Sequence, residues 1–374
     1  MSPSKRPPFR ADQVGSLLRP PELQTARART KEGEISAQDL REIENQAIRE
    51  VVALQEAAGL EGITDGEFRR AFWHVDFLTG LAGIRSTQSQ YAVRFRGEHG
   101  ETAETRSMLV VDEKIRRVRP VMLDHFTFLK SITTCTPKFC IPSPAYLHMR
   151  GARRVISETV YPDIEEFWSD VIRAYREQIV DLAAAGCTYL QLDDVSFACL
   201  CDEKIREQIR KDGEDPSKLP AKYVQVINEI IAGRPEGMTV TMHTCRGNYQ
   251  SMWMAEGSYD AVAEAVFSSS QVDGLFLEFD REERTGGFEP LRFVRQGMRV
   301  VLGLISSKVP ELESKDVLKR RIDQAAKYVP LDALCISPQC GFASTAAGNR
   351  VSVDVERRKL ELVVEVANEV WGGL

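Results

Sequence analysis

Short apolar segments rich in β-branched residues alternate with amphipathic helical segments along most of this chain. About eight of them have strand length, and this alternation is typical of a parallel β/α barrel. The expected strands are residues 9–16, 63–70, 138–141, 188–194, 240–245, 274–278, 298–304 and 333–336. The expected helices are residues 37–58, 164–185, 222–232, 261–268, 315–328 and 353–371. The sequence therefore predicts an α/β fold, a (β/α)8 TIM-type barrel.

The alternation is interrupted at residues 71–132, where the pattern is irregular and residues 85–105 are mostly polar. We interpret this segment as an inserted excursion after the second strand, with hairpin strands near 91–95 and 108–111. The rest of residues 1–374 is expected to form one barrel domain. A doubly wound open sheet is the rival architecture, but no glycine-rich dinucleotide fingerprint follows the first strand.

Side chains that carry chemistry stand at or just beyond the carboxyl ends of the expected strands. Enzymes built on β/α barrels place their active sites at that rim, where the loops after the strands converge. The rim residues are Ser16, Glu67, Asp193, His243, Glu278, Ser306 and Cys340. The sequence thus predicts one site, assembled from segments far apart in the chain.

Composition argues against several classes of function. A net charge of −6 and a pI near 5.6 argue against a general nucleic-acid-binding protein, whose surface should be basic. No run of about 18 apolar residues occurs, so we expect no membrane-spanning helix. Residues 1–10 are polar, basic and proline-rich, without the apolar core of a secretory signal. The eight cysteines are therefore expected to be reduced thiols of a cytoplasmic protein, some of them metal-bound.

One strand-like segment carries a metal-binding pattern. His243 and Cys245 are two residues apart, so their imidazole and thiolate point to the same side of a strand, and this pair suits Zn²⁺. Glu278 ends another strand, and Cys340 lies in a Pro-Gln-Cys-Gly loop after a third. The alternative for His243, Cys245 and Cys340 is ordinary burial in the core. The alternative for Glu278 is an ion pair with Arg281. Together the four residues predict a zinc site, and ligands from three strand ends favour a catalytic over a structural one.

At this point six short motifs, in order, resemble the catalytic half of cobalamin-independent methionine synthase, and more closely its short single-domain relatives. The motifs are Gly15-Ser16, Asp65-Gly66-Glu67, Gln191-Leu192-Asp193, His243-Thr244-Cys245, Phe276-Leu277-Glu278 and Pro338-Gln339-Cys340-Gly341. The resemblance implies a catalytic zinc ion bound by His243, Cys245, Glu278 and Cys340. It also implies that Ser16, Glu67 and Asp193 hold the amino-acid part of homocysteine.

The implied reaction is transfer of a methyl group to a thiol, from a donor such as 5-methyltetrahydrofolate. His243, Cys245 and Cys340 are the expected catalytic residues, because coordination to zinc turns a weakly ionised thiol into a thiolate nucleophile. Two thiolates and one carboxylate around Zn²⁺ leave one net negative charge. We expect such electron-rich ligation to favour alkyl transfer to sulfur over activation of water.

The substrate-binding residues are expected to work by charge. Glu67 and Asp193 would receive an α-ammonium group, and Ser16 with nearby backbone N–H groups would receive a carboxylate. Ordinary hydrogen bonding at the rim is the alternative for each of the three. We also assign Arg246 to substrate binding, through an anionic group of the substrate or donor.

Two further arginines lie near the expected mouth of the site. Arg69 and Arg70 would either bind an anionic donor or substrate tail, or pair with Asp65 and Glu67. We favour pairing for Arg70.

The chain departs from the family where the donor would bind. Residues 303–308 read Gly-Leu-Ile-Ser-Ser-Lys and lack the histidine that protonates the leaving group in methionine synthase. Lys308 or His148 could serve as the acid instead. The alternative for each is a surface or core residue without a catalytic role. The tryptophan that stacks on folate has no counterpart in the loop at 141–144, and the family's duplicated N-terminal half is missing from these residues. The aromatic run at 72–74 is expected to line a donor pocket or to pack over the barrel mouth.

Two other functions therefore stay open. One keeps the zinc and the thiol but changes the electrophile, as in epoxide-to-coenzyme M transferases of the same superfamily. The other is a barrel that binds zinc without catalysis. The expected partners are a small-molecule thiol and a methyl or alkyl donor, with neither nucleic acid nor membrane, and assembly into a homo-oligomer is left open.

Overall fold

The computed structural model describes residues 6–372 and contains a parallel sheet of seven strands, in the order β1-β4-β5-β6-β7-β8-β9. The strands are β1 Gly62–Ile63, β4 Thr136–Pro142, β5 Tyr189–Asp194, β6 Thr239–Thr244, β7 Gly274–Glu278, β8 Arg299–Ile305 and β9 Leu334–Pro338. Almost every strand residue is buried, as expected for a sheet covered on both faces, and this burial explains the continuous apolar runs in the sequence. The sheet is curled into a half-barrel, which confirms the predicted fold class.

The sheet is open rather than closed, because the first predicted strand does not form. Residues 9–16 make only an isolated parallel bridge, between Ala11 and Ile336 of β9. The Asp12 carboxylate accepts the backbone N–H groups of Phe9 and Gln13, so these groups do not enter a ladder. Residues 63–70 are expected to be a strand that runs into a polar loop, and the strand part is short, since β1 ends at Ile63.

Side chains span the gap between β1 and residues 9–16 in place of a backbone ladder. The Thr64 hydroxyl donates to the Gly15 carbonyl at 2.6 Å, and the Gln13 amide donates to the Thr64 hydroxyl at 3.3 Å. Inside the half-barrel, Lys138 forms a buried ion pair with Asp12 at 3.1 Å. These polar contacts fix residues 9–16 against the sheet, which leaves Ser16 at its rim.

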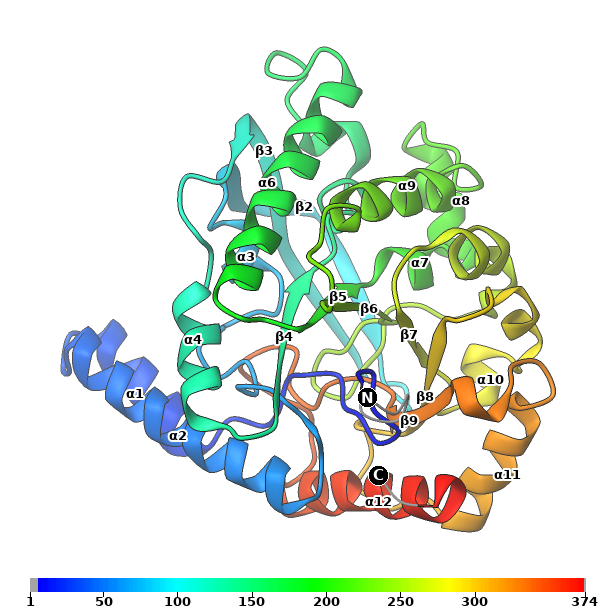
Figure 1. Ribbon diagram of the computed structural model, residues 1–374. Coiled ribbons are helices and arrows are strands. Elements are labelled where there is room, and N and C mark those ends of the chain that lie inside the picture. The colour runs from blue at the N-terminus through cyan, green and yellow to red at the C-terminus, as the bar shows by residue number, and fades with distance from the viewer. Residues whose placement is uncertain (1–5, 373–374) are drawn as a thin grey trace.

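Helices lie around the outside of the curled sheet (Figure 1). The helices of eight or more residues are α1 Pro21–Lys31, α2 Ala37–Ala57, α4 Leu123–Ile132, α6 Ile164–Ala184, α8 Glu203–Lys211, α9 Leu219–Ile231, α11 Lys315–Ala325 and α12 Val353–Trp371. The short ones are α3 Val75–Leu78, α5 Tyr146–Met149, α7 Ser196–Cys199 and α10 Glu282–Thr285, with 3₁₀ turns η2 Ala152–Val155, η3 Tyr259–Ala261, η5 Glu289–Phe293 and η6 Leu331–Ala333 and the π-helical turn η4 Glu264–Ser268. Ser36 caps α2 in a capping box with Asp39, as the sequence pattern indicates.

One helical prediction needs correction, and three helices of eight or more residues have no counterpart in the sequence analysis. The helix expected at 261–268 is a 3₁₀ turn followed by the π-helical turn η4, so it never becomes a regular α-helix. Helices α1, α4 and α8 were not expected; α1 and α8 are strongly polar, and their apolar contacts are few. No helix among residues 6–372 combines the length and the apolar character needed to span a membrane.

The excursion contains a long antiparallel hairpin, of β2 Ala82–Arg96 and β3 Thr102–Arg116. It is much longer than the strands expected at 91–95 and 108–111, and α3 and α4 flank it. Its far end pairs with the loop after β6, where Arg96 and Trp253 exchange backbone hydrogen bonds at 2.8 and 2.9 Å. The hairpin therefore crosses the end of the half-barrel where the loop after β6 lies (Figure 1).

Candidate functional site

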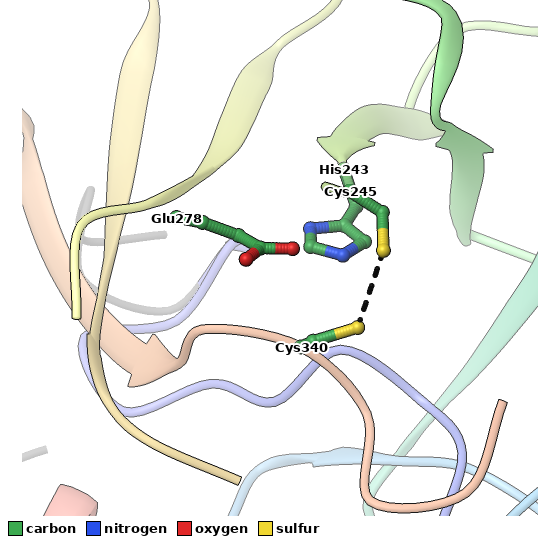
Figure 2. Close-up of side chains that lie close together, drawn as sticks. All are labelled: His243, Cys245, Glu278 and Cys340. Atoms are coloured by element: carbon green, nitrogen blue, oxygen red, sulfur yellow. Dashed lines mark hydrogen bonds between the residues drawn. The ribbon is translucent and has the colours of Figure 1, made fainter. Parts of the chain in front are cut away.

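Four side chains meet at the carboxyl end of the sheet. His243 lies at the end of β6 and Glu278 at the end of β7, while Cys245 and Cys340 lie in the loops after β6 and β9. One potential ligand atom from each residue lies within 4.8 Å of the other three, and all four residues are buried. The two sulfur atoms are 3.4 Å apart, and the four side chains point to one centre (Figure 2). We call these residues the donor set.

Several atoms of the donor set have no partner of their own. Within residues 6–372, neither ring nitrogen of His243 has a hydrogen-bond partner, and Oε2 of Glu278 has none. The other oxygen, Oε1, accepts the backbone N–H of Arg246 at 2.8 Å, which orients the carboxylate. Buried polar atoms without partners are costly. One imidazole, two thiols and one carboxylate at these separations fit a tetrahedral zinc ion, whose bonds are about 2.0–2.3 Å long.

The pKa values of the two thiols of the donor set are shifted in opposite directions. The hydrogen bond between them raises the pKa of Cys245 and lowers that of Cys340 well below its usual range, so one proton is shared. Burial alone would lower the pKa of His243, but Cys340, Asp193 and Glu278 raise it overall. Burial also raises the pKa of Glu278. The site is thus organised around negative charge, as a cation site requires.

A second buried cluster lies beside the donor set and consists of Glu67, Cys140 and Asp193. We call these residues the carboxylate cluster. The backbone of Glu67 is left-handed, with φ of 60°, and its N–H donates to Asp65 at 2.9 Å. This unusual conformation is supported by a tight turn and places the side chain at the pocket. The Asp193 carboxylate accepts the Gln191 amide at 2.7 Å.

Both carboxylates of this cluster hold protons unusually tightly. Burial raises the pKa of Glu67 to about 7, although Arg70 opposes the shift, with its Nη1 3.7 Å from Oε2 of Glu67. Burial raises the pKa of Asp193 to about 6, opposed chiefly by His243. The Cys140 thiol donates to the Val14 carbonyl at 3.3 Å. A positively charged group placed between these carboxylates would relieve their repulsion and favour their charged forms.

Both clusters face one pocket of about 860 Å³, measured out to the solvent at its mouth. One wall is aromatic and consists of Phe72, Trp73, His74 and Tyr146. The His74 ring lies 4.6 Å from Trp73 and 4.3 Å from Tyr146 between ring centres. Burial lowers the pKa of His74 to about 3, so this ring is neutral and acts as one more flat aromatic surface. The expected contribution of residues 72–74 to a pocket wall is thus seen in the structure.

Ser16 also lines this pocket, in a tightly packed position. A Cβ atom on Gly341 would lie 2.0 Å from the Ser16 hydroxyl oxygen, so only glycine fits there. The Phe342 N–H donates to the Ser16 carbonyl at 2.8 Å. The loop that carries Cys340 therefore also holds Ser16 in place.

The cationic residues lie differently from what the sequence suggested. Arg246 is fully buried, packs on Tyr259 with its guanidinium carbon 4.5 Å from the ring centre, and does not line the pocket. Arg69 approaches Glu44 at 3.5 Å, away from the pocket. Arg70 pairs with Glu67, as favoured. The structure does not bring Arg246 to the position expected of a substrate ligand.

The alternative partners of the site residues also have definite places. Arg281 pairs with Glu98 of the hairpin at 2.8 Å, and so does not neutralise Glu278. His148 bonds to the Tyr223 hydroxyl at 2.9 Å in the core. Lys308 is buried beside the donor set but does not line the pocket. Neither His148 nor Lys308 therefore faces the space where a donor would bind.

Sequence reasoning missed several residues of the site. Cys140 belongs to the carboxylate cluster, although its strand was read only as an apolar element. Tyr146 and Arg150 come from α5 and the residue after it, and Phe95 comes from the hairpin. The Pro-Ser-Pro loop before α5 marks a rim position and is the one sequence signal that could have indicated Tyr146 and Arg150. No sequence pattern indicates that the hairpin, with Phe95, folds back over the pocket.

Comparisons with known proteins agree with this architecture. Residues 9–369 match the family model described as the cobalamin-independent synthase catalytic domain. The chain is 47% identical over 369 residues to the uncharacterized protein YxjG of Bacillus subtilis strain 168, covering 98% of this chain and 96% of that protein. It is 23% identical over 345 residues to 5-methyltetrahydropteroyltriglutamate–homocysteine methyltransferase of Thermotoga petrophila, covering 90% of this chain but 42% of that protein.

A solved structure matches over nearly its whole length. It is a candidate vitamin-B12-independent methionine synthase from Listeria monocytogenes, 38% identical, with a TM-score of 0.78, and the match covers 98% of this chain and 99% of the other. A B12-independent methionine synthase from Shewanella sp. W3-18-1 shares the fold at 20% identity and a TM-score of 0.69, over 96% of this chain and 97% of the other. The chain belongs to the family of the cobalamin-independent methionine synthase catalytic domain.

Proposed function

We propose that this protein transfers a methyl group to the thiol of homocysteine, with zinc held by His243, Cys245, Glu278 and Cys340. The observation that carries the proposal is the donor set itself, whose ligand atoms lie within 4.8 Å of one another beside two carboxylates. Family membership supports the reaction class. Zinc bound there would lower the pKa of a coordinated thiol and keep its sulfur nucleophilic.

The carboxylate cluster would bind the amino-acid end of the substrate. Glu67 and Asp193 would accept the α-ammonium group, and Arg70 would hold Glu67 in position. Ser16, which lines the same pocket, would donate to the substrate carboxylate. Because the two clusters share one pocket, a short aliphatic thiol can place its ammonium in one and its sulfur in the other.

The aromatic wall would receive the methyl donor and exclude water from the reacting atoms. Trp73, His74 and Tyr146 present flat apolar surfaces next to the donor set, and His74 stays neutral at physiological pH. Arg150 lines the same part of the pocket, with its guanidinium 5.9 Å from the Tyr146 ring. A planar donor with an anionic group, such as 5-methyltetrahydrofolate, matches this chemistry.

The missing acid on the loop after β8 favours a second candidate. That loop presents Ser306 and Ser307 in place of the family's histidine. A donor whose leaving group needs no protein acid would suit this pocket as well. So would an epoxide that opens on a different thiol, if its ring-opened alkoxide takes a proton from solvent. This candidate keeps the zinc and the thiol but changes the electrophile.

Metal analysis combined with a thiol panel tests the proposal. The purified protein should contain about one zinc per chain and methylate homocysteine faster than 2-mercaptoethanol or coenzyme M. Transfer to coenzyme M with an epoxide, and none to homocysteine, would favour the second candidate. Zinc without turnover of any thiol would identify a non-catalytic zinc-binding protein, and absence of zinc would remove both enzyme functions.

A further inference from the structure

Lys308 is a buried lysine without a partner. Its residue is 6% exposed, and its Nζ has no hydrogen-bond partner within residues 6–372. Lysine is almost never buried unless it is paired, because an unpaired ammonium loses its hydration without compensation. Some negative charge nearby must therefore offset the cost of keeping Lys308 in place.

The loop that carries Lys308 is fixed against the donor set. The Ser307 N–H donates to the Gln339 side chain at 2.6 Å, and the Ser307 hydroxyl donates to the Gly341 carbonyl at 3.0 Å. Gln339 and Gly341 are the two neighbours of Cys340. On the other side, Gly303 of β8 is in register with Glu278 of β7.

The charge of Lys308 acts on the same residues. Burial raises the pKa of Glu278, and Lys308 is the strongest influence in the opposite direction. Lys308 also helps to lower the pKa of Cys340, after Cys245 and His243. Since it does not line the pocket, Lys308 influences the donor set rather than contacting a bound donor.

Arg246 is a second cation of this kind. Its backbone N–H orients Glu278, but its three guanidinium nitrogens have no hydrogen-bond partner among the described residues, and it is 0% exposed. The Asp193 carboxylate, beside His243, accepts only the Gln191 amide within residues 6–372, whereas two other arginines nearby are paired. Arg284 binds Asp280 at 2.6 Å, and Arg70 approaches Glu67 at 3.7 Å. Lys308 and Arg246 are thus two buried cations near the donor set whose side-chain nitrogens bind no partner among the described residues.

Asp193 is assigned to the ammonium group of the substrate in the proposed function. Counted over the donor set, the zinc ion and the two cations alone, the charges then balance only when an anionic sulfur ligand is added, a count that rests on that proposed function. Two thiolates and one carboxylate around Zn²⁺ carry one net negative charge, and the two cations turn this into one net positive charge. A substrate thiolate, whose proton leaves to solvent, brings the sum to zero. A neutral thiol or the thioether product leaves it positive, and net charge in a buried site is unfavourable.

We propose that Lys308 and Arg246 are positioning residues that supply the counter-charge for a substrate thiolate in the donor set. They favour an anionic sulfur ligand over a neutral ligand of the same size. The same preference promotes release of the methylated product, which is a neutral thioether.

The test measures ligand binding to the cobalt-substituted protein, with 2-mercaptoethanol as an anionic-sulfur probe and imidazole as a neutral probe. Sulfur-to-cobalt charge-transfer absorption reports thiol binding without any turnover. K308M, which keeps the length of the side chain but not its charge, should weaken 2-mercaptoethanol binding by about tenfold or more and imidazole binding by less than about threefold. K308R should bind both probes within about threefold of the parent.

The matched control is K359M. Lys359 is another buried lysine, 3.1 Å from Glu313, and Glu313 in turn accepts the Ser306 N–H at 2.8 Å. K359M therefore disturbs the same loop but keeps the charge of Lys308, and it should bind 2-mercaptoethanol within about threefold of the parent. If K308M does not fold, as judged by circular dichroism, K308Q replaces it.

Parental thiol affinity in K308M would overturn the proposal, and so would equal losses for the thiol and imidazole. Either result, with normal cobalt uptake, leaves the proposed function standing. A parent protein that takes up no cobalt would overturn both, so the two failures are distinguishable.

Discussion

The donor set has four residues and the carboxylate cluster has three; both are buried at one pocket, but their chemistry differs. Each brings cysteine and carboxylate atoms within 4.8 Å of one another. The donor set offers one nitrogen, two sulfurs and a single carboxylate, and unpartnered atoms remain on His243 and Glu278. The carboxylate cluster offers two carboxylates and one thiol that already donates to Val14. Soft ligands select zinc, whereas the raised pKa values of two facing carboxylates suit an ammonium group.

The difference shows that ligand type and existing hydrogen bonds, rather than proximity, decide what a cluster binds. Arg70 stands 3.7 Å from Glu67, so this cluster already has one cation nearby. A divalent ion would have to compete with that arginine. In the donor set, in contrast, no arginine or lysine among residues 6–372 forms an ion pair with Glu278.

The largest effect is expected from removing a ligand of the donor set. C340A or H243A should lower zinc affinity and methyl transfer by at least about a hundredfold, because three ligands hold zinc far less well than four. Zinc content and the rate of homocysteine methylation measure this. C335A, which removes a buried cysteine of the half-barrel interior, is the control and should keep its zinc. Retained zinc and full activity in both ligand variants would contradict the assignment.

A smaller, substrate-dependent effect is expected in the carboxylate cluster. D193N should raise the KM for homocysteine by about tenfold or more and leave the KM for 2-mercaptoethanol nearly unchanged, since only homocysteine carries an ammonium group. The same comparison applies to S16A. Equal changes in KM for both thiols would show that the cluster does not bind the amino-acid end of homocysteine. Loss of zinc from D193N would show that Asp193 also contributes to metal binding.

The pH dependence should separate the clusters further. Only ionised Glu67 attracts an ammonium group, and its pKa in the free site is about 7, so homocysteine affinity should fall as the pH drops from 8 to 6. We expect a decrease of about tenfold relative to 2-mercaptoethanol, whose affinity reports the ionisation of the thiol alone. The charged groups that act on Glu67 are Arg70, Asp193, Asp65 and Arg19. A pH-independent ratio of the two affinities would argue against this role of Glu67.

The smallest effect is expected for the cysteine of the carboxylate cluster. C140A should change zinc content and homocysteine KM by less than about threefold, because this thiol is held by Val14 rather than by substrate or metal. It is the direct counterpart of C340A. Loss of zinc in C140A would mean that the two clusters share the ion.

Much of this organisation could be predicted from the sequence, because parallel strands are apolar throughout and rim residues follow them directly. His243, Cys245, Glu278 and Cys340 were expected to meet, and the structure brings them together. The predictions failed where side chains replace backbone pairing, as Asp12 does at the first strand. They also failed for Arg246, because sequence position does not tell which way a long side chain turns after a strand. The aromatic contact between Phe95 and Tyr249, 5.2 Å between ring centres, depends on a hairpin path that no local pattern encodes.

The gap between β1 and residues 9–16 is joined by side chains, whereas the rest of the sheet is joined by backbone ladders. The ligands of the donor set stand on or just beyond β6, β7 and β9, which belong to an uninterrupted run of backbone ladders from β4 to β9. Ser16 and Glu67 stand on either side of the gap, where hydroxyl and amide side chains such as Thr64 and Gln13 do the joining. We therefore expect the positions of Ser16 and Glu67 to adjust more readily to a bound molecule than those of the donor set.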